Sequence, residues 1–224
     1  MITVKNLVKS FKDGPLETRV LKGIDFSASA GEFIAIMGRS GAGKSTLLYQ
    51  ISLLDEPTSG EIRISGKDTH TMTEKEKMLF RLSKFGYVFQ DYALLPELSA
   101  LENVVLPLLM QGLDPQKAEE KAARALTRVG LGNRLKNLPS QLSGGEQQRV
   151  SVSRAIAHDP EILFADEPTA NLDSESSATV MSIFKELHAK GQTIIMVTHE
   201  EEYARMTERV VKLDDGRIVS DTCS

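Results

Sequence analysis

The sequence predicts an α/β fold with a β-rich N-terminal part and an inserted helical part. Three observations lead to this prediction. Short apolar runs of the buried-strand type alternate with helical patterns after residue 143, which is typical of a parallel sheet with helical crossovers. One apolar run, at residues 31–37, leads directly into a glycine-rich loop. A stretch with helical periodicity, residues 100–130, interrupts the chain between strand patterns.

The N-terminal part is expected to consist mainly of strands. Period-two alternation or short apolar runs predict strands at residues 2–4, 24–26, 31–37, 60–65 and 86–89. The polar stretch at residues 66–77 is predicted to be a loop that enters a helix. The sheet therefore begins before the helical part of the chain.

The C-terminal part is expected to alternate helices and strands. The expected elements are a helix at residues 146–158, a strand at 162–166, a helix at 174–190 and a strand at 193–198. Asp159-Pro160 stops the first helix. Asp215-Gly216 lies between apolar runs within residues 209–219 and predicts a hairpin.

Composition is that of a soluble globular protein built on one α/β core. The 224 residues are 41% hydrophobic and carry a net charge of −4, so no positive field would hold nucleic acid, and we expect no nucleic-acid partner. The apolar runs are shorter than the roughly 18 residues of a membrane span, and the first residues lack the centre of a signal peptide. Cys223 is the single cysteine, so we expect no internal disulfide and a reducing compartment.

The glycine-rich loop contains the pattern G-x-x-x-x-G-K-S, which predicts a binding site for the phosphates of ATP. Its residues are Gly38, Arg39, Ser40, Gly41, Ala42, Gly43, Lys44, Ser45 and Thr46. Glycines let backbone N–H groups face phosphate oxygens, and the following helix adds its positive N-terminus. Lys44 is expected to reach the β- and γ-phosphates, and Ser45 to bind Mg²⁺. The alternative, a glycine turn with a solvated lysine, is disfavoured by the preceding buried strand.

The strand at residues 162–166 ends in the acidic pair Asp166-Glu167. At the end of a strand in a sheet that carries a phosphate loop, Asp166 is placed to hold Mg²⁺ through water. Glu167, one residue further on, is expected to polarise the attacking water. The alternative is that Asp-Glu-Pro is only a polar exit from the strand.

A second helix start has the sequence LSGGE, residues 142–146. Ser143 and Glu146 have the spacing of a capping box, so a well-capped helix is the simpler interpretation. Gly144 and Gly145 are poor residues for a first helical turn and are tolerated best where something approaches the backbone closely. Because helix starts attract anions, we expect Ser143, Gly144, Gly145 and Glu146 to bind phosphate as well.

These segments resemble the motifs of ABC ATPases. LSGGE, the following QQRVSVSRA and then ADEPTANLDS are similar to the signature, Walker B and D-loop motifs, and the resemblance runs from LVKSF at residues 7–11 to VTHE at 197–200. It implies a P-loop NTPase fold with a mixed central sheet, an N-terminal antiparallel β subdomain and an inserted helical subdomain. Residues 1–224 would form one nucleotide-binding domain. Its core and β subdomain would occupy about 1–90 and 159–224, and its helical subdomain, which carries the signature, about 91–158.

The resemblance assigns roles to four more residues. Phe11 matches the aromatic residue that stacks on adenine, where Tyr is usual, and a core phenylalanine is the alternative. Gln90 matches the Q-loop glutamine that reaches Mg²⁺ and the attacking water. His199 matches the switch histidine that contacts the γ-phosphate. Asp173 matches the D-loop aspartate, although its position also suits an N-cap, and both roles stay open.

The resemblance also implies partners. In this family the signature of one subunit closes on ATP held by the other subunit, so we expect a homodimer with two ATP molecules. The segment at residues 87–109 is similar to the subgroup of lipoprotein-releasing, macrolide-export and cell-division ATPases. Their partner is an FtsX-like or MacB-like permease, which implies a cytoplasmic protein held at the inner face of the membrane. Five side chains are expected to shape the docking groove: Leu94, Leu95, Leu98, Val104 and Leu108.

Three other functions are alternatives to transport. A soluble ABC ATPase for DNA repair or translation would need a long coiled coil or two cassettes, and neither is visible. A regulatory complex, as in cell division, is separated from transport only by the identity of the permease. A P-loop kinase is disfavoured by the intact LSGGE together with Glu167.

Overall fold

The computed structural model describes residues 1–223, without the side chain of residue 13, and the chain forms two compact units. The first unit comprises Met1–Leu79 and the segment that begins at Gly191, and the second comprises Phe80–Lys190. The second unit thus contains the strands on either side of the expected helical subdomain. The limits of about 91 and 158 for that subdomain stay a prediction.

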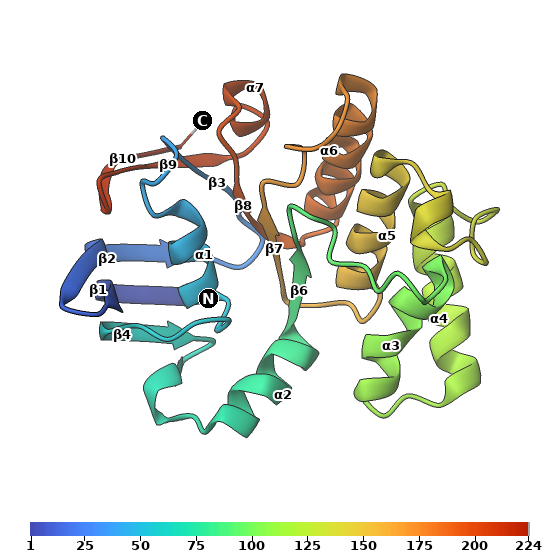
Figure 1. Cartoon of the computed structure of the whole chain (residues 1–224), viewed down its shortest axis with the longest axis horizontal. Coiled ribbons are helices and arrows are strands. Elements are labelled where there is room, and N and C mark those ends of the chain that lie inside the picture. The colour runs from blue at the N-terminus through green and yellow to red at the C-terminus, as the bar shows by residue number, and fades with distance from the viewer. Residues whose placement is uncertain (224) are drawn as a thin grey trace. The chain divides into compact units, whose positions relative to one another are not determined.

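The first unit contains an antiparallel sheet built mainly from the N-terminal strands. Its strands are β1 (Ile2–Asp13), β2 (Leu16–Ala28), β4 (Ser59–Ile64) and β5 (Lys67–Asp68), in the order β2-β1-β4-β5 (Figure 1). The short 3₁₀ helix η1 (Thr69–Thr71) follows β5. The strands β1 and β2 extend far beyond the predicted residues 2–4 and 24–26. Most side chains between residues 9 and 20 are exposed, so that part of the hairpin lacks the alternating pattern from which a strand is predicted.

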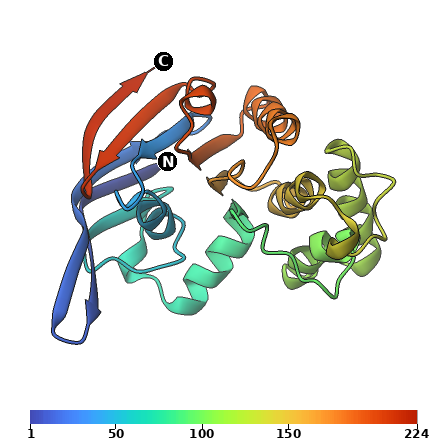
Figure 2. The ribbon, with the colours of Figure 1, turned by 45° about the horizontal axis from the view of Figure 1, so that its top comes forward.

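A second sheet in the first unit is mixed, as predicted. Its strands are β3 (Phe33–Gly38), β8 (Thr193–Val197), β9 (Arg209–Asp214) and β10 (Arg217–Cys223), in the order β10-β9-β3-β8. The strand β3 is parallel to both β8 and β9, whereas β10 runs antiparallel to β9. Asp215-Gly216 forms the predicted turn of the C-terminal hairpin (Figure 2). The helices α1 (Lys44–Ile51) and α7 (Glu201–Ala204) follow β3 and β8.

The second unit combines a parallel pair of strands with a group of helices. The strands are β6 (Phe85–Val88) and β7 (Ile162–Asp166). The helices are α3 (Ala100–Met110), α4 (Pro115–Arg128), α5 (Gly144–Ile156) and α6 (Ser174–Ala189), with the 3₁₀ helix η2 (Pro139–Gln141) before α5 (Figure 1). The helix α2 (Glu74–Lys84) spans the boundary between the units.

Local signals explain where these helices begin. Ser99 and Glu102 form a capping box at the start of α3. The predicted helical stretch at residues 100–130 divides into α3 and α4 because Gly112 adopts φ 84° and Asp114-Pro115 opens a new helix. No helix within residues 1–223 has both the length and the hydropathy needed to cross a membrane.

The strand β6 and the helix α5 approach each other closely at Gly86. A Cβ at this position would collide with the carbonyl oxygen of Ala155, a backbone atom that cannot rotate away. Next to it, the ring of Phe85 packs edge-on against Phe164 at a centroid distance of 5.0 Å. The packing of α5 on β6 therefore requires a glycine at position 86, because any side chain there would collide with α5.

We predict that Gly86→Ala lowers the free energy of unfolding by about 1–3 kcal/mol, the usual cost of an inserted methyl group in a packed interior. Chemical denaturation measures the difference. Lys117→Ala, at an exposed position on α4, is the control and should change stability by no more than about 0.5 kcal/mol. Equal stability of Gly86→Ala and the parent chain would contradict the close approach of β6 and α5.

Candidate functional site

The predicted phosphate loop connects the buried strand β3 to the helix α1. Gly41 and Gly43 adopt φ values of 79° and 98°, in the left-handed region that favours glycine. A Cβ on Gly43 would lie 2.9 Å from Leu21 of β2, so a larger residue would displace the loop. The turn at Gly216 fixes the loop from another side, because its N–H donates to the carbonyl of Ala42 at 3.1 Å. The loop conformation is thus held by its neighbours in the first unit.

The N-terminus of α1 differs from the other long helix starts. Within the described residues no side chain caps it, and Gly43 occupies the N-cap. The helices α3, α4, α5 and α6 all begin with a side chain that accepts a backbone N–H. Lys44 is buried at this end of α1, and its ammonium donates to the carbonyl of Arg39 at 3.2 Å. This helix start, with its positive dipole end and a buried lysine, is chemically suited to a phosphate group.

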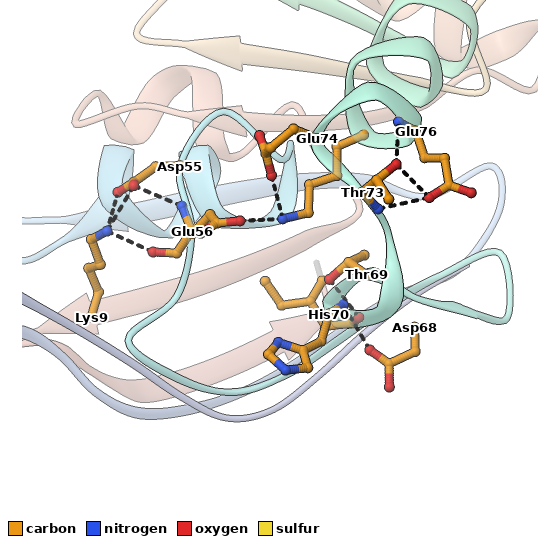
Figure 3. A network of polar contacts seen from close by, with 11 residues as sticks. Lys9, Asp55, Glu56, Asp68, Thr69, His70, Thr73, Glu74 and Glu76 are labelled. Carbon is orange, nitrogen blue, oxygen red and sulfur yellow. Dashed lines mark hydrogen bonds and ion pairs between the residues drawn. The ribbon is translucent and has the colours of Figure 1, made fainter.

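Phe11 lies on β1, where 48% of its surface is exposed. The alternative of a core phenylalanine is therefore wrong, and stacking on adenine stays a prediction. The ammonium of Lys9 lies 5.0 Å from the centroid of the Phe11 ring, a cation–π distance. The same ammonium donates to Asp55 at 2.8 Å and to the Glu56 carbonyl at 2.7 Å (Figure 3). Gln50 of α1 also binds Asp55, so Phe11 is connected to α1 through polar contacts.

His199 follows β8 in the first unit, and its residue surface is exposed. The preceding Thr198 is buried, and its hydroxyl accepts the N–H of Glu200 at 3.1 Å. This hydrogen bond shapes the backbone on the C-terminal side of His199. The first unit thus holds the expected phosphate loop, the aromatic residue and the histidine.

Asp166 and Glu167 lie at the end of β7 in the second unit. Asp166 is only 5% exposed and ends the buried strand. Glu167 has φ 44°, a left-handed conformation that non-glycine residues rarely adopt. Such strained residues concentrate at functional sites. Gln148 of α5 supports the next residue, because its amide donates to the carbonyl of Pro168 at 2.7 Å.

The helix α5 begins with the predicted capping box. The hydroxyl of Ser143 accepts the N–H of Glu146 at 3.2 Å, and the Glu146 carboxylate accepts the N–H of Ser143 at 2.9 Å. That backbone hydrogen bond, with Arg134 beside it, holds the pKa of Glu146 below its ordinary value. The box does not use the N–H groups of Gly144 and Gly145. It is therefore compatible with an anion at this helix start.

Packing within the chain gives Gly144 and Gly145 a second explanation. A Cβ on Gly144 would lie 3.0 Å from the hydroxyl of Tyr92, and a Cβ on Gly145 would collide with Ser176 of α6. Phosphate binding is therefore not the only reason for two glycines at this place. The two explanations are compatible, because the close contacts lie where a side chain would be and the capping box does not use the N–H groups of these glycines.

Asp173 and Gln90 occupy neighbouring loops of the second unit. Asp173 is the N-cap of α6 and accepts the N–H of Ser176 at 2.8 Å. The hydrogen bonds from the backbone and the hydroxyl of Ser176 lower the pKa of Asp173. The capping role is confirmed, whereas the D-loop role stays a prediction. The Gln90 side chain is exposed, and its backbone carbonyl accepts the side-chain amide of Asn171 at 3.0 Å.

Sequence reasoning missed four residues that support the expected site. Lys9, Gln148, Arg154 and Asn171 donate mainly to backbone carbonyls far away in the sequence. Such contacts leave no periodic or spacing signal. Gln148 is fully buried within α5, and this burial becomes visible only in the structure.

The donor set fits Mg²⁺ held mainly by phosphate and water. Within residues 1–223 no three His, Cys, Asp or Glu side chains group as a metal site. Mg²⁺ commonly keeps several waters and takes one or two protein carboxylates together with substrate phosphates. Ser45, at the start of α1 in the first unit, has a hydroxyl, and Asp166, at the end of β7 in the second unit, has a carboxylate. Both are ligand types that Mg²⁺ accepts, and their shared role stays a prediction.

Comparisons with known proteins identify relatives of the chain. A family model described as ABC transporter matches residues 21–170. The chain is 49% identical over 202 residues to the lipoprotein-releasing system ATP-binding protein LolD of Aquifex aeolicus, covering 90% of each chain. It is 44% identical over 222 residues to the macrolide export ATP-binding/permease protein MacB of Marinobacter nauticus, covering 99% of this chain but 34% of MacB.

A solved structure is similar along the whole chain. It is the dimeric post-hydrolysis state of the ATP-binding cassette MJ0796 bound to ADP and Pi, which matches with a TM-score of 0.93 and 38% identity. The match covers 100% of this chain and 98% of that one. The predicted fold class is thereby confirmed.

We predict that Glu146→Gln reduces the loss of stability in acid. The folded-state pKa of Glu146 is lowered, so its carboxylate stabilises the folded chain above the ordinary pKa, and this contribution disappears as pH falls through the lowered value. Gln accepts the same hydrogen bond but does not titrate. Between about pH 6 and pH 3 the parent chain should therefore lose more free energy of unfolding than the variant in urea titrations. Equal losses would contradict the stabilising role of the Glu146 charge.

Proposed function

The chain belongs to the ABC transporter family of ATP-binding proteins and hydrolyses ATP, and we propose that it is the ATPase subunit of a complex with a separate membrane permease. The nucleotide would act in two ways, as the substrate and as the contact between two copies of the chain.

Residues of the first unit bind the nucleotide. The open N-terminus of α1 and the glycine-rich loop at residues 38–46 bind the phosphates through backbone N–H groups. Lys44 exchanges its contact with the Arg39 carbonyl for the terminal phosphates. Phe11 stacks on adenine, with its ring held by Lys9. His199 contacts the γ-phosphate.

Residues of the second unit act on the attacking water. Glu167 orients the water and accepts its proton, and the left-handed backbone at this residue fixes the direction of the carboxylate. Asp166 and Gln90 are proposed ligands of Mg²⁺, and Ser45 of the first unit is the third proposed ligand. The ion would neutralise the charge that develops on the phosphates. Asp166 is fixed for this role because it ends a fully buried strand.

Two copies of the chain would share each ATP. Ser143, Gly144 and Gly145 of one copy would face the phosphates bound by the other copy, since the capping box leaves the N–H groups of both glycines out of its own hydrogen bonds. Asp173 would lie beside the same interface. The dimeric state of MJ0796 with ADP and Pi supports this arrangement.

An apolar groove in the second unit supports the proposal that the chain binds a permease. It is a cavity of about 270 Å³ between α3, β6 and the C-terminal end of α5. Its lining includes the partly exposed side chains of Leu95, Leu106 and Met110, at 44%, 38% and 62%. An apolar groove of this kind accepts one face of an amphipathic helix. We assign it to a cytoplasmic helix of the permease.

The groove differs in part from the sequence-based expectation. Of the five expected side chains Leu95 lines this cavity, whereas Leu94 and Leu98 are half-buried and lie outside its lining. Val104 and Leu108 are fully buried instead and pack inside the second unit. Their helical spacing predicts a core face equally well, which is why sequence alone does not separate the two roles.

The relatives support a transport function of the lipoprotein-release or efflux type. MacB is named as both an ATP-binding protein and a permease, and this chain matches 34% of its length. LolD is matched over 90% of its length and is named as an ATP-binding protein of a lipoprotein-releasing system. We infer an FtsX-like or MacB-like permease as the partner, which would hold the chain at the cytoplasmic face of the membrane.

We predict that Glu167→Gln binds ATP, loses turnover by about 10²–10⁴-fold, as expected for the loss of a general base, and forms a dimer with ATP. Size-exclusion chromatography with and without ATP, together with phosphate release, measures both effects. Adding Ser143→Arg to this variant should abolish the dimer while nucleotide binding persists. A Glu167→Gln chain that hydrolyses ATP at the parental rate would refute the role of Glu167.

We predict that Leu106→Asp and Met110→Asp prevent co-purification of the permease from membranes. A carboxylate in the groove would have to be desolvated against an apolar helix face, which is strongly unfavourable. Basal ATP hydrolysis of the isolated chain should stay within about twofold, because both side chains are partly exposed. Leu16→Asp, at a position 71% exposed on β2, is the matched control and should retain the permease. Retention by all three variants would exclude this groove as the docking site.

A further inference from the structure

Asn171 connects two loops of the second unit that carry expected catalytic residues. It lies after the Walker B strand, between Glu167 and Asp173 in the sequence. Its side-chain amide donates to the backbone carbonyl of Gln90 at 3.0 Å. This distance is ideal for an N–H···O hydrogen bond, and the two residues are 81 positions apart. The position of Gln90 is therefore tied to the loop that contains Asn171.

A second contact joins the same two loops in the opposite direction. The hydroxyl of Tyr92, two residues after Gln90, donates to the backbone carbonyl of Asn171 at 3.4 Å. This hydroxyl is also the atom that lies 3.0 Å from a Cβ placed on Gly144. The loops of Gln90 and Asn171 and the start of α5 therefore meet around Tyr92.

The loop after Gln90 is held in an unusual backbone conformation. Tyr92 and Ala93 have φ values of 65° and 47°, in the left-handed region, which costs free energy for residues other than glycine. Arg154 of α5 donates one N–H to the carbonyl of Tyr92 at 2.9 Å and another to the carbonyl of Ala93. The guanidinium thus binds two consecutive carbonyls of the strained loop that follows Gln90.

These contacts connect the docking groove to the catalytic loops. Arg154 and Leu95 line the groove, and Arg154 also donates to the carbonyl of Tyr92. The hydroxyl of Tyr92 donates to the carbonyl of Asn171, and the Asn171 amide donates to the carbonyl of Gln90. The groove is thereby connected to the Gln90 loop and to the D-loop. Every link is a hydrogen bond within the second unit. A change in the groove that moves Arg154 would therefore move the Gln90 and Asn171 loops together.

We propose that Asn171 is a positioning residue that fixes Gln90 relative to the D-loop and thereby sets the rate of ATP hydrolysis. Asn171 acts through Gln90 and the D-loop, and it contacts no phosphate itself. The inference rests on the proposed roles of Gln90 and Glu167. Its effect falls on the catalytic step, because the phosphate loop and Phe11 bind ATP without it.

The test compares Asn171→Ala and Asn171→Asp with the parent chain in steady-state ATP hydrolysis. Asp is nearly isosteric with Asn but lacks the N–H that binds the Gln90 carbonyl. We expect kcat to fall about tenfold in both variants, which corresponds to about 1.4 kcal/mol, while KM for ATP changes by less than about twofold. Ser174→Ala, in the adjacent turn, is the matched control and should leave kcat unchanged.

A double-mutant cycle with Gln90→Ala separates positioning from general stability. If Asn171 acts through Gln90, Asn171→Ala should slow the Gln90→Ala chain by less than about twofold. An equal tenfold loss in both backgrounds, or no loss in the parent background, would overturn the proposal. Retained turnover in Gln90→Ala would overturn it too, because no catalytic residue would then need positioning.

Failure of the proposed function gives a different result. A Glu167→Gln chain that keeps full turnover removes the catalytic assignment whatever Asn171 does. A Glu167→Gln chain that loses turnover, combined with an unchanged kcat in Asn171→Ala, rejects only the role of Asn171. Thermal unfolding of the Asn171 variants within a few degrees of the parent chain shows that reduced kcat does not reflect unfolding.

Discussion

A helix start without a side-chain cap is the constraint on which this structure depends. The N-terminus of α1 has no side-chain cap among the described residues, and Gly43 at the N-cap is held against Leu21 and Val20 of β2. Most long helices of the chain use a side-chain oxygen at this place. Omitting the cap costs helix stability, so the surrounding strands and the turn at Gly216 must fix the loop instead. The β-rich N-terminal part therefore has a second role, which is to hold the glycine-rich loop in its conformation.

The sequence predicted the elements whose identity depends on burial or on a fixed spacing. The strands β3, β7 and β8 are apolar along nearly their whole length, and a capping box pairs two residues that are three positions apart. Both features can be recognised in the sequence. The outer half of the β1–β2 hairpin left none, because its side chains face solvent on both sides. The same limit applied to Val104 and Leu108 of α3, because the same helical spacing is expected for residues of a core face and for residues that line a groove.

The sequence allows candidate site residues to be proposed where they stand in a local motif. It does not reveal supporting residues that act through a long-range contact. Lys44, Asp166 and Glu167 stand in motifs of adjacent residues. Arg154 and Asn171 donate to backbone carbonyls 61 to 81 positions away. Because every residue has a backbone carbonyl, nothing in the sequence indicates which carbonyl such a donor will bind. The left-handed backbone of Tyr92 and Glu167 was hidden for a related reason, since neither residue type favours that conformation.

The two close approaches of α5 restrict how this helix can move. Gly86 of β6 lies against its C-terminal turn, and Ser176 of α6 lies against Gly145 in its first turn. With backbone or side-chain atoms touching both ends, axial sliding or rotation of α5 in place would produce a collision. A displacement of α5 that begins in the groove would therefore move β6 and the start of α6 with it, because the close approaches at Gly86 and at Gly145 leave little space for α5 to shift alone.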